Sequence, residues 1–208
     1  MELKELTKIT AILRGYELET VRKICQALVQ TQEIRNIEVT MNTSGALEII
    51  QQISQEFGQQ LAIGAGTVMT LAQAEAAHQR GAQFFLSPTL MDQQICDYAR
   101  ARQVLTISGA LSPTEVWQAA QQVDVVKVFP ATSVGNTYFK DIKAPLGQLK
   151  LMAVGGVNQD NGKSFLENGA DYLGVGGIFK NCDMVSASVE QLAEAAKSFE
   201  KKVVGGTK

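Results

Sequence analysis

The sequence has little of what metal sites and disulfide frameworks require. Its 208 residues include one histidine and three cysteines, and Cys25, Cys96 and Cys182 lie far apart with no CxxC pair. Protein zinc sites draw on clusters of histidine and cysteine, so we expect no bound metal. An odd number of widely spaced cysteines is typical of reduced thiols. We therefore expect a cytoplasmic protein.

The chain also lacks an excess of charge of one sign and a long apolar run. Its formal net charge is -2, so no basic field favours nucleic acid as a partner. No stretch reaches the roughly 18 apolar residues of a membrane helix. The N-terminal segment MELKELTKITAILRG mixes charges into its apolar positions, unlike a signal peptide. We expect neither a nucleic-acid partner nor a membrane partner.

What the sequence does contain is a regular alternation of short apolar runs with helix-forming segments. Hydrophobic residues make up 45% of the chain, which is enough for a sizeable core. Eight apolar runs are predicted to be strands: 9–14, 34–42, 61–68, 84–88, 104–110, 125–130, 151–157 and 172–178. Helices are predicted between them at 17–30, 43–57, 71–80, 92–102, 113–122 and 159–168. Ser112 before Pro113 is a typical helix start.

Repeated strand-then-helix units predict parallel strands joined by crossover helices, and eight units predict a closed α/β barrel of the (β/α)8 TIM type. An open doubly wound sheet is the alternative. We expect a single barrel domain over 1–208, with a flexible C-terminal tail at 203–208. The segment 132–147 is less regular and is expected to hold only a short helix. Trp117 is interpreted as a packing residue.

Lys127 lies in the apolar run VVKVF. Side chains alternate along a strand, so Val126 and Val128 would pack outward, whereas Lys127 and Phe129 would point into the barrel. Burial favours the neutral amine, which is the form that an amine nucleophile needs. A structural lysine paired with a carboxylate is the competing interpretation.

The same alternation places Glu38 of NIEVTMN in the interior. This carboxylate could pair with Lys127 as a buried ion pair, or it could transfer protons during catalysis. At the ends of their runs, Arg14 could bind an anion bidentately, and Thr67 offers a hydroxyl and a loop amide at the same rim.

Glycine pairs end the last two runs, Gly155–Gly156 and Gly176–Gly177. Glycine lets backbone amides approach a ligand closely, and phosphate sites commonly form after strands seven and eight of such barrels. The pairs therefore predict a phosphate-binding end. Tight turns without a binding role are the alternative.

Motifs in this order resemble the family of 2-keto-3-deoxy-6-phosphogluconate (KDPG) and 4-hydroxy-2-oxoglutarate (KHG) aldolases. The matching segments cover nearly the whole barrel: ILRG at 12–15, IEVT at 37–40, GAGTV at 64–68, SP at 87–88, SPTEV at 112–116, VKVFPA at 126–131 and GGV at 155–157. The resemblance implies a class I aldolase that needs neither metal nor cofactor. It also implies a homotrimer and a keto-acid sugar phosphate as the small-molecule substrate.

By this resemblance Lys127 matches the Schiff-base lysine and Glu38 the general acid/base. Arg14 and Thr67 match substrate-contacting positions, and Pro88 and Phe129 match residues that shape the pocket. The phosphate end corresponds to Gly155, Gly156, Gly176 and Gly177.

The sequence departs from the family pattern at two positions. Asn42 stands where relatives typically carry an arginine that helps to hold the keto-acid carboxylate, and Gly177 stands where they tend to carry a serine. Each departure removes a polar contact to an anionic end of the substrate. The lysine chemistry is left intact, and the departures bear on which substrate binds and how tightly.

The sequence therefore predicts an aldolase that splits 2-dehydro-3-deoxy-6-phosphogluconate into pyruvate and glyceraldehyde 3-phosphate. KHG aldolase and 2-dehydro-3-deoxy-6-phosphogalactonate aldolase activities are alternatives. A sugar-phosphate isomerase that does not need Lys127 and a catalytically silent binding protein are the competing hypotheses of other classes.

Overall fold

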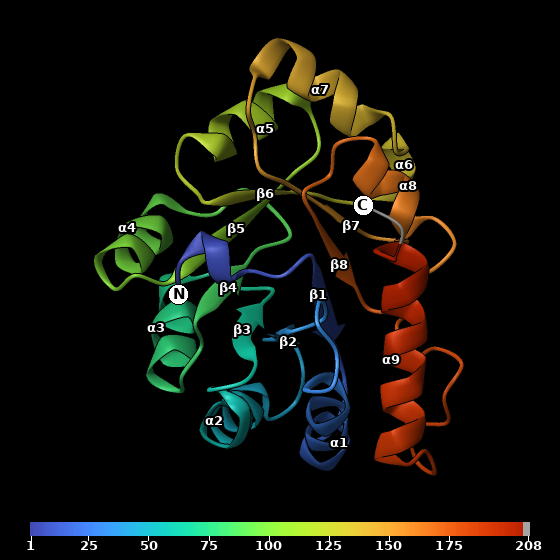
Figure 1. The fold of residues 1–208 in the computed structure, drawn as a ribbon. Helices are drawn as coiled ribbons and strands as arrows, with labels where there is room; N and C mark the ends of the chain where they lie inside the picture. The colour runs from blue at the N-terminus through green and yellow to red at the C-terminus, as the bar shows by residue number, and fades with distance from the viewer. Residues whose placement is uncertain (206–208) are drawn as a thin grey trace.

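The strands predicted from the sequence close into a parallel barrel. The computed structural model describes residues 1–205, and its eight strands pair in chain order, with β8 returning to β1. Figure 1 shows the strands at the centre and the helices outside them. The strands are β1 Ile9–Leu13, β2 Asn36–Thr40, β3 Ala62–Gly66, β4 Phe84–Leu86, β5 Leu105–Ala110, β6 Val125–Val128, β7 Leu151–Val154 and β8 Tyr172–Val175.

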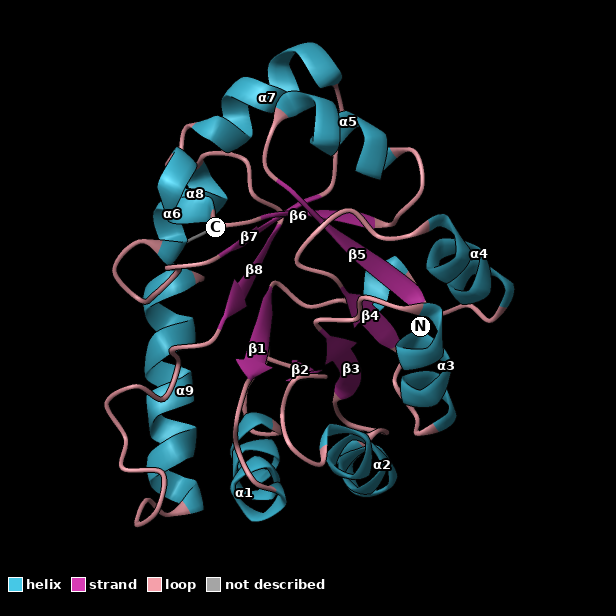
Figure 2. Cartoon of the chain, turned by 180° about the vertical axis from the view of Figure 1, so that it is seen from behind, coloured by secondary structure: helices cyan, strands magenta, loops and turns pink. Residues whose placement is uncertain are grey.

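Helices follow the strands and form the outer layer, as the view from behind also shows (Figure 2). They are α1 Leu18–Leu28, α2 Ala46–Phe57, α3 Leu71–Gln79, α4 Gln93–Ala101, α5 Pro113–Ala120, α6 Ala131–Val134, α7 Tyr138–Leu146, α8 Gly162–Glu167 and α9 Val189–Val203. The start of α5 is the predicted one, because Ser112 and Glu115 form a capping box around Pro113.

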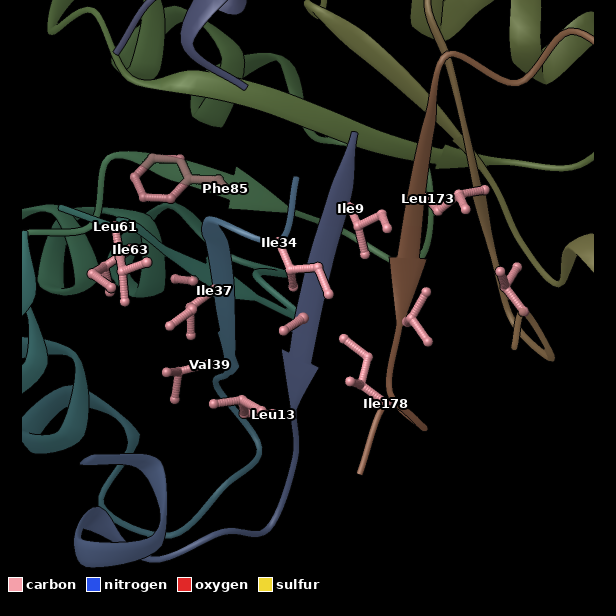
Figure 3. Packing of buried hydrophobic residues seen from close by; sticks show 14 of the residues in the cluster. Ile9, Leu13, Ile34, Ile37, Val39, Leu61, Ile63, Phe85, Leu173 and Ile178 are labelled. Atoms are coloured by element: carbon pink, nitrogen blue, oxygen red, sulfur yellow. The ribbon is translucent and has the colours of Figure 1, made fainter. Parts of the chain in front are cut away.

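The apolar side chains form two cores, one on each face of the barrel wall. Ile37 and Val39 on β2 belong to the outer core between strands and helices, as do Ile9 and Leu13 on β1 (Figure 3). The inner core fills the barrel with Leu6, Phe84, Leu86, Leu105, Ile107, Val125, Met152 and Val154. This division follows the two-residue alternation of side chains along each strand.

Small residues on the strands make room for the larger ones inside. A Cβ on Gly64 would lie 2.2 Å from the Phe84 ring, and one on Gly174 would lie 2.8 Å from Val154. Because side chains fill the interior, a ligand would bind at the end of the barrel where the strands have their C-terminal ends. At the opposite end, the short 3-10 helix η1 (Leu3–Glu5) precedes Leu6, which enters the inner core.

Three expectations about the outer layer are wrong. The segment 132–147 holds most of α6 and all of α7, whose Phe139 and Ile142 are buried. The tail does not begin at residue 203, because Val203 ends α9 and is 2% exposed in the outer core. Residues 206–208 of the predicted tail lie outside the described part. Trp117 on α5 does not pack in the core of the chain, since it is 49% exposed.

Candidate active site

Lys127 lies inside the barrel, as the strand alternation predicts. Its neighbours Val126 and Val128 belong to the outer core, and its own side chain is only 5% exposed. Burial lowers the pKa of the Lys127 ammonium; the charge of Glu38 opposes this shift and the charge of Arg14 adds to it. A lowered pKa increases the fraction of neutral amine, which is the nucleophilic form.

Glu38 enters the same interior from the opposite side of the barrel. It lies on β2 and Lys127 on β6, and four strand steps separate these in the closed eight-stranded sheet. Its side chain is 1% exposed. Burial raises the pKa of the Glu38 carboxyl, although Lys127 and Arg14 both oppose the shift.

The Glu38 carboxyl is held by shape more than by hydrogen bonds. A Cβ on Gly66 of β3 would lie 1.7 Å from Glu38 Oε1, so the present position of this oxygen depends on glycine at that site. Within residues 1–205, Glu38 Oε2 is buried with no hydrogen-bond partner, and no ion pair joins Glu38 to Lys127. Buried carboxylate oxygens normally find a partner, which leaves this oxygen available to a bound molecule.

Three side chains from neighbouring strands meet at the rim. Arg14 Nη1 donates to Asn42 Oδ1 at 2.7 Å, and Arg14 Nη2 lies 3.5 Å from Thr67 Oγ1. Thr67 has a left-handed backbone with φ of 56°, a conformation that costs a non-glycine residue roughly 1–2 kcal/mol. The sequence predicted each residue near the rim but not the contact between Arg14 and Asn42, which depends on the pairing of β1 with β2.

The predicted pocket residues Pro88 and Phe129 also lie at the C-terminal ends of their strands. Lys127 Nζ is 5.2 Å from the centre of the Phe129 ring, and the ring is partly exposed. Pro88 packs against β5, where a Cβ on Gly109 would lie 2.3 Å from the Pro88 carbonyl carbon. An aromatic face and a proline thus border the lysine at the rim.

The two glycine pairs present free backbone donors. Gly155 and Gly156 have φ of 96° and 74°, so β7 ends in a left-handed turn that favours glycine. Among residues 1–205, the backbone N–H groups of Gly155, Gly156, Gly176 and Gly177 have no hydrogen-bond acceptor. Successive unpaired N–H groups make a concave site for an anion.

The sequence analysis missed three side chains at this end of the barrel, Thr132, Asn158 and Asn161. Each donates a hydrogen bond to a carbonyl of the first glycine pair. The asparagines that closely follow Gly155–Gly156 were the available signal, because asparagine commonly bonds nearby backbone in turns.

The closed barrel and its charged interior define an enzyme of the (β/α)8-barrel class. Residues 2–195 match the family model described as KDPG and KHG aldolase. The chain therefore belongs to the KDPG and KHG aldolase family, and its class of activity is that of an aldolase.

Similar proteins carry names for two different sugar acids. A probable 2-dehydro-3-deoxy-6-phosphogalactonate aldolase from Rhizobium meliloti (strain 1021) is 30% identical over 95% of this chain and 93% of its own. A 2-dehydro-3-deoxy-phosphogluconate aldolase from Treponema pallidum (strain Nichols) is 33% identical over 77% of this chain and 76% of its own. A solved structure described as native KDPGal has a TM-score of 0.82 at 26% identity and covers 93% of both chains.

Residues 1–205 contain neither a metal-ligating cluster nor a membrane-spanning helix. No group of three or more histidine, cysteine, aspartate or glutamate side chains is arranged there to hold a metal ion. None of the helices in this part of the chain has the length and apolar character needed to cross a membrane.

Proposed function

We propose that the protein is a class I aldolase that cleaves 2-dehydro-3-deoxy-6-phosphogluconate to pyruvate and glyceraldehyde 3-phosphate through a Schiff base on Lys127. The observation that carries the proposal is the pair inside the barrel. A buried lysine with a lowered pKa shares the barrel interior with a buried glutamate whose Oε2 has no hydrogen-bond partner among residues 1–205. A sugar-phosphate isomerase would have no need for such a lysine.

The chemistry begins with attack of the neutral Lys127 amine on the C2 carbonyl, which forms a carbinolamine. Loss of water gives an iminium at C2. When a base removes the C4 hydroxyl proton, the C3–C4 bond breaks, its electrons neutralise the iminium, and the aldehyde leaves. The remaining enamine takes a proton at C3, and water then releases pyruvate and restores the amine.

Glu38 supplies the proton transfers in this scheme. A raised pKa makes the buried Glu38 carboxylate a stronger proton acceptor, and the carboxyl can return the proton in a later step. Its place across the barrel from Lys127 and its free Oε2 suit it to protonate the departing carbinolamine hydroxyl and to exchange the proton of the C4 hydroxyl.

The two anionic ends of the substrate find donors at different parts of the rim. Arg14 and Thr67, from the β1 and β3 sides, would bind the carboxylate. The free amides after β7 and β8 would bind the phosphate, and Pro88 and Phe129 would border the carbon chain. This order along the rim gives the extended substrate one orientation over Lys127.

The C4 epimer, 2-dehydro-3-deoxy-6-phosphogalactonate, is the second candidate substrate. The Rhizobium relative that matches almost the whole chain carries that name. Both epimers yield pyruvate and the same aldehyde, so a comparison of kcat/KM for the two epimers and for 4-hydroxy-2-oxoglutarate assigns the preference.

Covalent trapping tests the Schiff base. Treatment with pyruvate and borohydride should reduce the iminium and add a stable mass to the peptide that contains Lys127. The Lys163→Ala variant, which removes an exposed lysine paired with Glu167, should be labelled to the same extent as the parent protein. An undiminished adduct in Lys127→Ala would overturn the assignment.

Asn42 should act on the substrate carboxylate through Arg14. We expect Asn42→Ala to raise the KM for pyruvate in the condensation direction by about tenfold or more, because a hydrogen bond to a charged group contributes roughly 1.5–3 kcal/mol and about 1.4 kcal/mol corresponds to a factor of ten. The kcat should change less, since the contact serves ground state and transition state alike.

The double variant provides the control for Asn42. In an Arg14→Ala background, Asn42→Ala should have little further effect, because the two residues form one unit. Additive losses in steady-state kinetics would show instead that Asn42 contacts the substrate independently of Arg14.

We also propose that the protein is a homotrimer, as the family resemblance implies. Trp117 is exposed on α5, and the apolar side chains of Leu90 and Leu111 are exposed on the preceding loops. Large apolar side chains that are exposed in a single chain are candidates for burial between chains. Trp117→Arg should lower the mass measured by light scattering from three chains toward one. Val185→Arg, which changes an exposed apolar residue between β8 and α9, should leave three.

A further inference from the structure

Both carbonyl groups of the Gly155–Gly156 pair are tied to side chains that the aldol chemistry does not use. The backbone N–H and the Oγ1 of Thr132 each lie 3.2 Å from the Gly155 oxygen. The side-chain amides of Asn158 and Asn161 donate to the Gly156 oxygen at 3.2 and 3.0 Å. Four donors thus hold two consecutive carbonyls.

These donors are themselves fixed in place. Asn161 Oδ1 accepts from the Asn158 backbone N–H at 2.8 Å, and Asn158 Oδ1 accepts from the Asp160 N–H at 2.8 Å. Each asparagine therefore turns its NH2 group toward Gly156. A Cβ on Gly156 would lie 2.5 Å from Thr132 Oγ1, so the hydroxyl packs directly against the glycine.

The direction of the carbonyls determines the direction of the amides. In a trans peptide unit the N–H points opposite to the C=O. The Gly155 carbonyl faces Thr132, which follows β6, so the Gly156 N–H points away from β6 and toward the side of β8. The Val157 N–H likewise points away from the two asparagines. Within residues 1–205 neither N–H has an acceptor.

We propose that Thr132, Asn158 and Asn161 are positioning residues that hold the amides after β7 as a preformed site for the substrate phosphate. The inference rests on the proposed function, because it names the side chains that prepare that phosphate end. Consecutive backbone N–H groups that are free of other acceptors can form an anion-binding nest. None of the three side chains needs to touch the phosphate itself.

The three positioning side chains matter because the backbone of glycine adopts many conformations. Without them, the Gly155–Gly156 segment would exchange among several backbone conformations, and the entropy lost in ordering it would weaken phosphate binding. A segment already held in its binding conformation avoids this loss. The effect should fall on the phosphorylated substrate and spare an unphosphorylated one.

The test compares two substrates in the same protein, the keto-deoxy acid with and without its phosphate. Thr132→Val and Asn161→Leu should each lower the ratio of kcat/KM for the phosphorylated substrate to that for the unphosphorylated one by about tenfold. Thr132→Ser, which keeps the hydroxyl, should retain the ratio. Asn168→Leu is the matched control, because Asn168 bonds the Ser164 carbonyl at the other end of α8.

The ratio of the two kcat/KM values distinguishes the ways in which the inference could be wrong. A general loss of folding lowers both rates and leaves the ratio unchanged, which would overturn the positioning role. That role is equally overturned if Asn168→Leu lowers the ratio as much as Asn161→Leu. If the parent protein shows no preference for the phosphorylated substrate, the phosphate end is overturned together with this inference, while trapping at Lys127 still tests the Schiff base.

Discussion

Lys127→Ala should reduce kcat for cleavage of the phosphorylated keto-deoxy acid by roughly 10⁴-fold or more, as the loss of a covalent nucleophile does in other enzymes. Alanine leaves no amine to form the iminium, and without that electron sink the C3–C4 bond has nowhere to release its electrons. Pyruvate formation, followed with a coupled assay, measures the loss.

The fold of the variant should survive, because Val126 and Val128, which join β6 to the outer core, are unchanged. Circular dichroism and thermal unfolding report this directly. Lys163→Ala provides the comparison, since this lysine is exposed on α8 and makes a 3.7 Å contact with Glu167 on the surface of the same helix. Substantial cleavage by Lys127→Ala, free of parent enzyme, would exclude the Schiff-base mechanism.

Glu38→Gln should lower kcat by about 10²–10⁴-fold, the range expected when a general acid–base group is lost. Glutamine has nearly the same shape but cannot carry a transferable proton. Trapping with pyruvate and borohydride should become slower but not disappear, because the Lys127 amine is still present. Steady-state kinetics and the rate of trapping measure the two effects.

The pH dependence gives a second measure of Glu38. Its negative charge raises the pKa of Lys127 against the effect of burial. Glutamine removes that charge, so the Lys127 pKa should fall further, and the acidic limb of the kcat/KM profile should move to lower pH. A limb that stays in place would indicate that Glu38 is protonated when Lys127 titrates.

Gly66→Ala tests the role of the Glu38 carboxyl independently, because it displaces the carboxyl without changing Glu38 itself. An added Cβ would lie 1.7 Å from Glu38 Oε1 and must displace it. The variant should lose activity, and combining it with Glu38→Gln should cost much less than the sum of the two losses, because both changes act on one group. Additive losses would show that Gly66→Ala lowers activity by a cause other than the displacement of Glu38.

Local sequence pattern was sufficient for the barrel and for the direction of its catalytic candidates. The alternation in VVKVF and NIEVTMN placed Lys127 and Glu38 inside because successive side chains of a strand point to opposite faces whatever the strand pairs with. The capping box at Ser112 likewise depends only on residues close in the chain. Residues close together in the chain are enough to produce these features, so the sequence alone predicts them.

The outer layer shows where local pattern was misleading. The chain end was expected to be a flexible tail from residue 203, yet Val203 ends α9 in the outer core. Trp117 suggested a buried side chain, although it is exposed on α5. Burial at these positions depends on which helices lie beside one another, and helical periodicity alone does not specify that.

The sequence by itself determined the eight strand-and-helix units, the inward lysine and glutamate, and the glycine turns after the last two strands. Only the tertiary structure decided which groups meet. Closure of the sheet placed β2 opposite β6. The pairing of β1 with β2 brought Arg14 to Asn42, and the pairing of β6 with β7 laid Thr132 against Gly155–Gly156. The physical reason is that a side chain's direction follows from its own backbone, whereas its partner comes from the register of distant strands and the packing between them.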